Sequence, residues 1–394
     1  MRNNKLRSFF TLDKKSFYEW NNSYIKKVIE VLNKDKLVII KWLRNVWKIN
    51  FIIDFINKAK LTANYFYFNK SDDIENTIST SQELESLFNE YVKLYKNPKI
   101  IILQDISKIE GIKDFISNIY KQNYKTILVW NTIKIWWIKE IEILPEISIN
   151  KENVENTIKY WTINEIKTNN SNILKEKILN LMISDIFLND IFRNYWVKNI
   201  DLYNFTITYL AYNSFYLSLR DIQKRLEIIQ NISLKTTIDY IDFSIQEKII
   251  KRVYNYNFKT NKVVTSKAKY YFNNNWIRNC LWNFEVSEEI LIENLVFNIL
   301  ELHNYKIFWW INWNFEFTFY WELIVNELEN NKLFVHISKS TNLEDLMKEV
   351  NNLLRIWVNW KKYILIENAW KLWITQFMYD GVEIIEIKNF LEKF

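Results

Sequence analysis

Short apolar runs alternate with amphipathic stretches along the first 130 residues of the chain. Nearly continuous apolar runs of five or six residues are typical of strands that are buried on both faces. Between them, apolar residues three and four positions apart predict helices at 50–60 and 80–95. This alternation predicts an α/β fold with a parallel sheet that is covered by helices on both faces. The four predicted strands are residues 37–41, 63–68, 99–104 and 125–130.

The pattern changes twice after residue 150. Helical periodicity dominates from 150 to 260, and a further helix is predicted at 289–303. Strands and a helix at 342–356 follow, which together predict a small α/β domain. These strands are predicted at 305–310, 315–320, 322–328, 332–337 and 362–366. The predicted domains are 1–150, 151–280 and 281–394.

Eighteen tryptophans and only two glycines make the composition unusual. A globular protein of this length would have about 28 glycines at the usual frequency of about 7%. Several tryptophans stand beside Asn and Lys in turn-like segments such as 312–314 and 357–361, where glycine is typical because it adopts positive φ without steric cost. We hypothesise that most of these tryptophans are glycines in the source organism, encoded by UGA. The alternative is a genuinely tryptophan-rich protein of an AT-biased genome.

The remaining composition excludes several kinds of site. One cysteine, Cys280, excludes a disulfide framework and a cysteine-based zinc site. His303 and His336 are far apart in sequence, which argues against a histidine-rich metal site or a His-dependent triad. No apolar signal region follows the N-terminus and no uncharged apolar run reaches about 18 residues. We therefore expect a cytoplasmic protein with no membrane partner, whose net charge of +7 is spread along the chain.

Residues 37–50 combine a predicted strand, a loop and the start of a helix. If Trp42 and Trp47 are glycines, the loop becomes G-x-x-x-x-G-K, the spacing of a phosphate-binding loop. Its N–H groups and the helix N-terminus would surround the phosphates, and Lys48 would reach the β- and γ-phosphates. The predicted ATP-binding residues are Trp42, Leu43, Arg44, Asn45, Val46, Trp47, Lys48, Ile49 and Asn50.

With these two glycines, the loop resembles the G-[IL]-R-R-V-G-K-[ST] motif of a prokaryotic AAA-type ATPase family, and the resemblance covers nearly the whole chain. Members have a P-loop NTPase domain, a winged-helix middle and a C-terminal domain with a restriction-endonuclease-like fold. The resemblance implies that ATP is the ligand and that Asn131 and Thr132 belong to the sensor region. The other matching segments are 105–111 (Walker B), 125–132 (strand ending in T-G-S-N), 145–149 (P-L-S-F), 269–279 (K-Y-Y-F-x-D-x-G-[IL]-R-N) and 291–296 (L-[IL]-E-N-L-V).

The chain departs from this family where Mg²⁺ is held and water is activated. Ile49 replaces the Ser/Thr that ligates Mg²⁺. Gln104 and Asp105, the catalytic candidates, stand at the Asp-Glu pair of Walker B; alternatively Asp105 is the Walker B Asp and Ile106 takes the Glu position. The segment 136–140 also lacks the family's arginine. The sequence therefore predicts ATP binding with weak hydrolysis, and it assigns no certain metal ligand.

The C-terminal domain lacks carboxylates that a restriction-like nuclease uses to hold metal. Glu293 matches the family's helix Glu, but Thr318 stands where E-[IV]-D-F has its Asp. Lys339 has no acidic residue two positions before it. We expect Glu293 to be structural or solvated rather than a metal ligand, and the domain not to cut DNA.

Residues 217–226 and 235–241 predict two helices, and 249–256 predicts part of a hairpin. This order is typical of a winged helix, in which Lys235, Thr236 and Thr237 would open the helix that faces a DNA major groove. A packing module without DNA contact fits the same order. Two hypotheses follow: a slow AAA-type ATPase, or a catalytically dead module that binds DNA or a protein partner.

Overall fold

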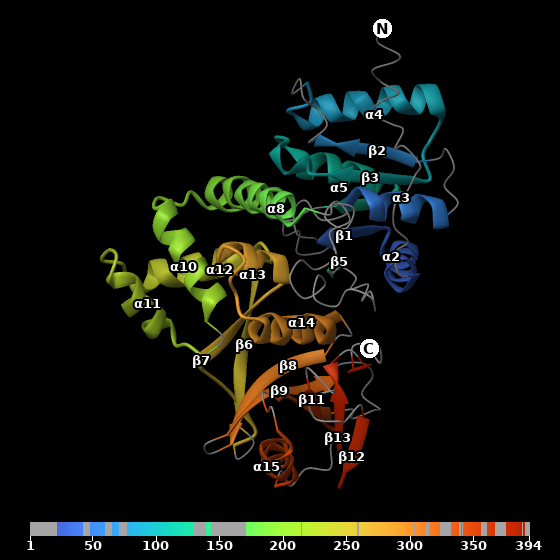
Figure 1. Ribbon diagram of the computed structural model, residues 1–394. Coiled ribbons are helices and arrows are strands. Elements are labelled where there is room, and N and C mark those ends of the chain that lie inside the picture. The colour runs from blue at the N-terminus through green and yellow to red at the C-terminus, as the bar shows by residue number, and fades with distance from the viewer. Residues whose placement is uncertain are drawn as a thin grey trace. The chain divides into compact units, whose positions relative to one another are not determined.

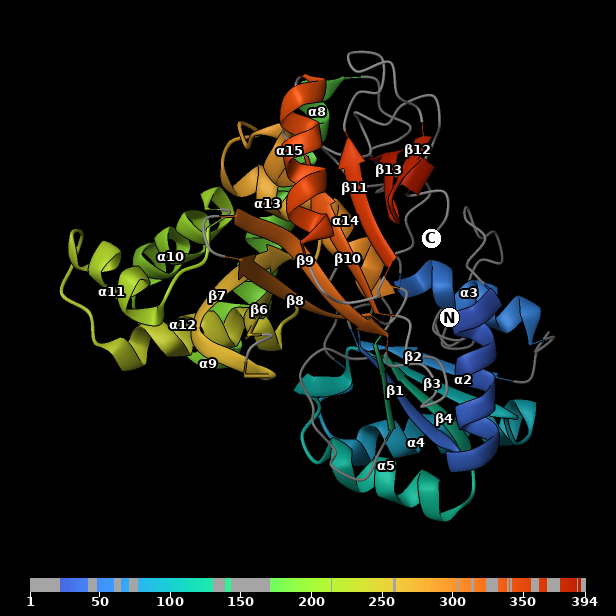
Figure 2. The same ribbon diagram turned by 90° about the horizontal axis from the view of Figure 1, so that it is seen from below.

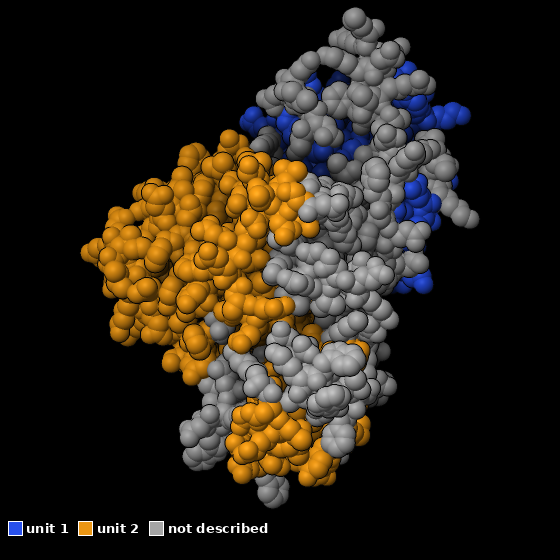
Figure 3. Space-filling view, viewed as in Figure 1, with its two compact units in different colours: residues 1–146 blue, residues 147–394 orange. Residues whose placement is uncertain are grey.

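The computed structural model describes residues 22–41, 48–59, 65–70, 77–129, 139–142, 171–213, 215–257, 260–302, 305–312, 315–323, 332–338, 340, 342–355, 361–366, 376–387 and 389–390. The chain divides into two compact units, residues 1–146 and 147–394 (Figure 3). The division into three domains stays a prediction.

Unit 1 contains a sheet of five strands in the order β2-β3-β4-β1-β5, and all of its pairings are parallel (Figure 1). Every residue of β2 and β3 is buried, which explains why these strands are continuous apolar runs rather than alternating ones. The four strands predicted here are confirmed, while β5 was not predicted. The strands are β1 (Leu37–Lys41), β2 (Tyr65–Asn69), β3 (Ile100–Gln104), β4 (Lys125–Val129) and β5 (Lys139–Glu142).

Helices cover both faces of this sheet: α2 (Asn22–Asp35), α3 (Lys48–Lys58), α4 (Ser81–Tyr95) and α5 (Ile112–Lys121). Phe88 of α4 and Phe115 of α5 belong to one apolar cluster with Leu103 of β3. The connection from β1 to β2 crosses the sheet in the opposite direction to those from β2 to β3 and from β3 to β4. Because such crossovers are right-handed, α3 lies on the face opposite α4 and α5, as Figure 2 shows. Both predicted helices of this unit are confirmed.

Unit 2 begins with helices that precede a hairpin. Ser218 and Asp221 form a capping box that starts α11, and Ser233 caps α12. The predicted order of helix, helix and hairpin is confirmed as a series of elements. These are α8 (Asn172–Ile186), a π-helical segment η3 (Phe187–Phe192), α9 (Arg193–Tyr195), α10 (Ile200–Tyr212), α11 (Leu219–Glu227), α12 (Leu234–Gln246), β6 (Ile250–Asn257) and β7 (Lys262–Phe272).

In the described residues, the rest of unit 2 adds further helices and strands. The strands form one eight-stranded sheet with this hairpin, in the order β12-β13-β11-β10-β9-β8-β6-β7. Asn255 of β6 pairs in parallel with Trp309 of β8, so the sheet crosses the predicted boundary at residue 280. The elements are α13 (Asn275–Leu281), α14 (Glu288–Leu302), β8 (Tyr305–Asn312), β9 (Phe315–Leu323), β10 (Lys332–Ile337), α15 (Leu343–Leu354), β11 (Lys361–Ile366), β12 (Gln376–Tyr379) and β13 (Val382–Glu386).

The predicted strands at 305–310, 315–320, 332–337 and 362–366 are confirmed within three residues. The separate strand predicted at 322–328 is corrected, because β9 continues through residues 322 and 323 without a break. Residues 324–328 lie outside the described residues. β12 and β13 were not predicted; they form an antiparallel pair around Gly381, whose φ of +85° suits glycine.

Candidate nucleotide site

The carboxyl ends of β1, β3 and β4 meet at one edge of the unit 1 sheet, because these strands are parallel neighbours. β1 lies between β4 and β5, and the chain leaves it to form β2 on the far side of β4 and β3. The edge beyond the carboxyl end of such a strand is where open α/β sheets bind ligands. β1 ends at Lys41 and α3 begins at Lys48. Only residues 42–47 separate this edge from a helix N-terminus in the sequence.

Several predicted site residues fall outside the structural description. Trp42, Leu43, Arg44, Asn45, Val46 and Trp47 lie outside the described residues, as do Asn131 and Thr132. The backbone of Lys48, Ile49 and Asn50 forms the first turn of α3, while their side chains are not described.

Gln104, the last residue of β3, is buried at this edge, with 4% of its surface exposed. Side chains alternate along a strand, and Leu103 packs in the cluster with α4 and α5, so Gln104 points to the face that α3 covers. The Tyr67 hydroxyl donates to Gln104 Oε1 at 3.1 Å, and Gln104 Nε2 donates to Asp105 Oδ2 at 3.3 Å. A neutral amide with partners on both sides therefore occupies the end of β3.

Asp105 follows at the same edge in a left-handed conformation, with φ of +52°. Asp is among the residues that tolerate this conformation best. Its N–H donates to the carbonyl of Val129, the last residue of β4, at 3.3 Å. Ile106 is fully buried in the cluster with α4 and α5, so it does not reach the edge. Gln104 and Asp105 therefore lie at this edge and Ile106 does not, while their assignment to Walker B stays a prediction.

Tyr67 was not identified from the sequence. It lies in a run of aromatic residues that predicts a buried strand, and no local pattern marks one of them as a polar partner. Its role depends on the pairing of β2 with β3, in which Asn69 stands opposite Gln104.

The start of α12 holds the three residues proposed to face DNA. Lys235 is exposed and Thr236 is partly exposed. Thr237 is fully buried, and its Oγ1 donates to the carbonyl of Ser233 at 3.3 Å. Thr237 is therefore unsuited to base contact, and the proposal is corrected to Lys235 and Thr236.

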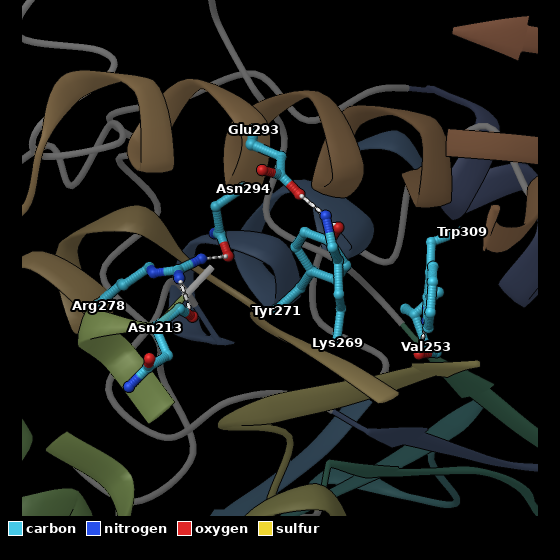
Figure 4. A network of polar contacts seen from close by, with 8 residues as sticks. All are labelled: Asn213, Val253, Lys269, Tyr271, Arg278, Glu293, Asn294 and Trp309. Atoms are coloured by element: carbon cyan, nitrogen blue, oxygen red, sulfur yellow. Dashed lines mark hydrogen bonds and ion pairs between the residues drawn. The ribbon is translucent and has the colours of Figure 1, made fainter. Parts of the chain in front are cut away.

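The two C-terminal segments that carry the family resemblance meet in a buried polar network in unit 2 (Figure 4). Arg278 is buried and donates through Nε to the carbonyl of Ala211 at 2.8 Å and through Nη2 to that of Asn213 at 2.9 Å. Its Nη1 reaches Asn294 Oδ1 at 3.3 Å. Burial lowers the pKa of Arg278 to about 10, so the guanidinium stays charged at neutral pH. These contacts connect α10, α13 and α14.

Asn294 completes this network through both ends of its amide. Its Oδ1 accepts from the N–H of Phe272 at 2.7 Å, and its Nδ2 donates to the carbonyl of Phe272 at 2.8 Å. Nδ2 also donates to Asn275 Oδ1 at 2.7 Å. Asn294 therefore has a structural role here: its hydrogen bonds attach α14 to the end of β7.

Glu293 lies beside this network and is held by the protein. Its Oε1 accepts from the Tyr271 hydroxyl at 2.6 Å and lies 3.3 Å from Lys269 Nζ (Figure 4). The side chains of Glu293 and Lys269 are only 15% and 6% exposed. The expectation that Glu293 is structural is supported, although it is paired rather than solvated. The side chains of Thr318 and Lys339 lie outside the part of the chain that the structure describes.

Cys280 and His336 are also buried side chains that contact other side chains of the protein. The Cys280 thiol donates to Asn180 Oδ1 at 2.9 Å, and burial raises its pKa to about 12. His336 Nε2 lies 3.5 Å from Glu349 Oε2. Burial alone would raise the pKa of Glu349, but hydrogen bonds with His336 and nearby serines lower it below its ordinary value. This pair attaches α15 to β10.

Within the described ranges, no group of three or more His, Cys, Asp or Glu side chains could hold a metal ion. No helix in the same part of the chain is long and apolar enough to cross a membrane.

Comparison with known proteins gives a remote structural likeness. No protein-family model matches the chain, and no curated protein matches it. A Walker-type ATPase of Pyrococcus abyssi is 12% identical with a TM-score of 0.46, over 67% of this chain and 96% of its own. The replication initiator DnaA bound to AMPPCP and single-stranded DNA is 15% identical with a TM-score of 0.28, over 61% of this chain and 92% of its own. Because both TM-scores are below 0.5, these likenesses assign no function to the residues of the candidate site.

The substitution Glu293→Ala is expected to destabilise the protein by about 3 kcal/mol, because it removes the carboxylate that pairs with the buried Lys269 ammonium. Equilibrium unfolding in urea measures the change. Glu288→Ala, at the exposed start of the same helix, is the matched control and should cost less than about 1 kcal/mol. Equal unfolding midpoints for the two variants would contradict a structural role for Glu293.

Proposed function

We propose that this chain is an AAA-type P-loop protein that binds ATP through residues 42–50 and hydrolyses it weakly. The observation that carries the proposal is the start of α3 at Lys48, seven positions after β1 ends at Lys41. A lysine in the first turn of a helix that follows such a strand is the arrangement of a phosphate-binding loop. In this arrangement ATP phosphates would lie between the loop and the end of β3, where Gln104 and Asp105 are found.

Weak hydrolysis is supported by the chemistry of the same edge. Gln104 carries no charge and cannot act as a base, and Asp105 is the one carboxylate at the end of β3. A water-activating group and a cation that stabilises the transition state can each contribute several powers of ten to the rate. Residues 136–140 lack the arginine that the family resemblance implies, so both contributions are reduced here.

The phosphate loop requires glycine at positions 42 and 47, and we propose that these positions and others are recoded. Trp196 closes α9 with φ of +51° and is 86% exposed, at a position where helices usually end in glycine. Trp276 is fully buried, and its Nε1 has no hydrogen-bond partner in the part of the chain that the structure describes.

Trp309 contrasts with these two residues. Its Nε1 donates to the carbonyl of Val253 at 3.1 Å (Figure 4), and its ring stacks on Tyr216 with 4.7 Å between centroids. A glycine here would lose this hydrogen bond and the stacking on Tyr216. We therefore propose glycine at 196 and 276 and a genuine tryptophan at 309.

A second candidate function is nucleic-acid binding by unit 2. It is favoured by the exposed Lys235 at the start of α12, in a helix–helix–hairpin order that suits a winged helix. The strands and α14 that follow would then form a restriction-endonuclease-like domain without nuclease activity, since Glu293 is paired with Lys269. A protein partner in place of DNA fits this candidate as well.

Full-length protein with glycine at positions 42 and 47 is expected to bind ATP and to lose that binding on Lys48→Ala. The reason is that the lysine would neutralise the β- and γ-phosphates. Isothermal titration calorimetry measures the affinity. Lys58→Ala, an exposed lysine at the other end of α3, is the matched control and should bind as the parent does. Equal affinities for the two variants would rule out a phosphate loop.

Turnover of ATP by the same protein is expected to stay well below the common enzyme rate of about 1 s⁻¹. The triple variant Ile49→Thr, Gln104→Asp and Asp105→Glu should be faster than the parent, because it restores a hydroxyl ligand and an acidic pair. A phosphate-release assay compares the two proteins, with Lys48→Ala added to the triple variant as the inactive control. A parent that already turns over at about 1 s⁻¹ or faster would refute the proposed loss of activity.

Peptide mapping by mass spectrometry, applied to protein isolated from the source organism, tests the recoding. We expect glycine at 42 and 47, where the phosphate-loop spacing requires it, and at 196, where φ is +51°. We also expect glycine at 276, where the buried indole Nε1 has no partner among the described residues, and tryptophan at 309. The intact protein would then be lighter than the 48.4 kDa of the printed sequence. Tryptophan at positions 42 and 47 would refute both the recoding and the phosphate loop.

A further inference from the structure

The polar pair at the end of β3 has a consequence for the form of ATP that the site accepts. We propose that the site binds ATP without a divalent cation, because a Tyr67–Gln104 pair occupies the place where a metal-dependent site needs a carboxylate. This inference rests on the proposed function and specifies its ligand as the free nucleotide rather than its Mg²⁺ complex.

Mg²⁺ does not fit the residues present. The ion prefers hard, anionic oxygen ligands in an octahedral arrangement, and P-loop proteins supply a Ser/Thr hydroxyl and an acidic residue. Ile49 provides no oxygen at the first of these positions. At the second, the amide oxygen of Gln104 is neutral and accepts from the Tyr67 hydroxyl at 3.1 Å. Both groups are almost fully buried, at 3% and 4% exposure, so their contact is protected from water.

Asp105 does not replace the missing ligands. One of its carboxylate oxygens accepts from Gln104 Nε2 at 3.3 Å, and its backbone is fixed to the end of β4 through Val129. A single carboxylate that is already engaged gives a metal ion one ligand at most. Within the described residues, no set of His, Cys, Asp or Glu side chains at this edge could add the others.

The neutral amide also removes a repulsion. A carboxylate beside a triphosphate is tolerated when a divalent cation lies between them, and without that cation the two anions repel each other in a partly buried site. With Gln104 the last position of β3 carries no such charge, and Asp105, which accepts from Gln104 Nε2, is the one carboxylate left beside it. The sequence of the predicted loop includes two cationic residues, Arg44 and Lys48, whose charge suits a triphosphate.

The test is a calorimetric titration of the full chain, carrying glycine at 42 and 47, with ATP in EDTA and again with excess Mg²⁺. We expect affinities that agree within about threefold, because no ligand of the site depends on the ion. Gln104→Asp should lower the affinity in EDTA by about tenfold or more through charge repulsion, and Mg²⁺ should restore it. Gln122→Asp adds the same charge at the opposite edge of the sheet, before β4 begins, and should leave both affinities unchanged.

Each result has a defined meaning. Binding by the parent that requires Mg²⁺ would overturn the metal-free site while leaving the proposed function intact. Absence of binding in both buffers would refute the proposed function itself, and this inference with it. The comparison of the parent in the two buffers decides the matter even if Gln104→Asp does not fold.

Discussion

The parallel pairing of β1 with β4 on one side and β5 on the other is the constraint on which the candidate site depends. It places the carboxyl end of β1 at the same edge as the ends of β3 and β4, and the right-handed crossover brings α3 onto the face to which Gln104 points. Three segments that are distant in the sequence thereby share one edge. The chemistry of that edge is then determined by a few side chains, among which Tyr67 and Gln104 form a neutral pair in place of an acid.

Unit 2 depends on a different kind of contact. Arg278 and Asn294 are buried polar groups that use backbone carbonyls and amides from α10 and β7 as partners. Breaking such a contact leaves a buried charge or amide without a partner, which costs far more than an exposed contact. The network gives the segments 269–279 and 291–296 a structural role, because their buried polar residues join α13 and α14 to the end of β7.

Much of the fold could be predicted because apolar runs and helical periodicity report burial directly. β5 was missed because it is a short charged strand, Lys139–Glu142, at the edge of the sheet. α5 was not predicted either, although the helical spacing of its apolar residues indicated it. These residues are Ile112, Phe115, Ile116 and Ile119. The Asp380–Gly381 dipeptide likewise marked the turn between β12 and β13.

The side-chain environments could not be predicted, because they depend on contacts between distant segments. The Tyr67 contact with Gln104 follows from strand register, and the burial of Thr237 follows from the packing of α12. Glu293 was assigned a structural role, but its partners, Lys269 and Tyr271, come from a strand more than twenty residues away. Residue identity alone cannot distinguish a paired carboxylate from a solvated one.

Hydrogen–deuterium exchange with and without ATP tests most directly whether residues 42–50 bind the nucleotide, since it locates the protected amides on the chain. In protein with glycine at 42 and 47, the account predicts slower exchange of backbone amides in 42–50, with a smaller effect at 104–105. Amides of the buried network around Asn294 should be unaffected. Protection confined to residues 171–394, or no change at 42–50 under saturating ATP, would contradict the account.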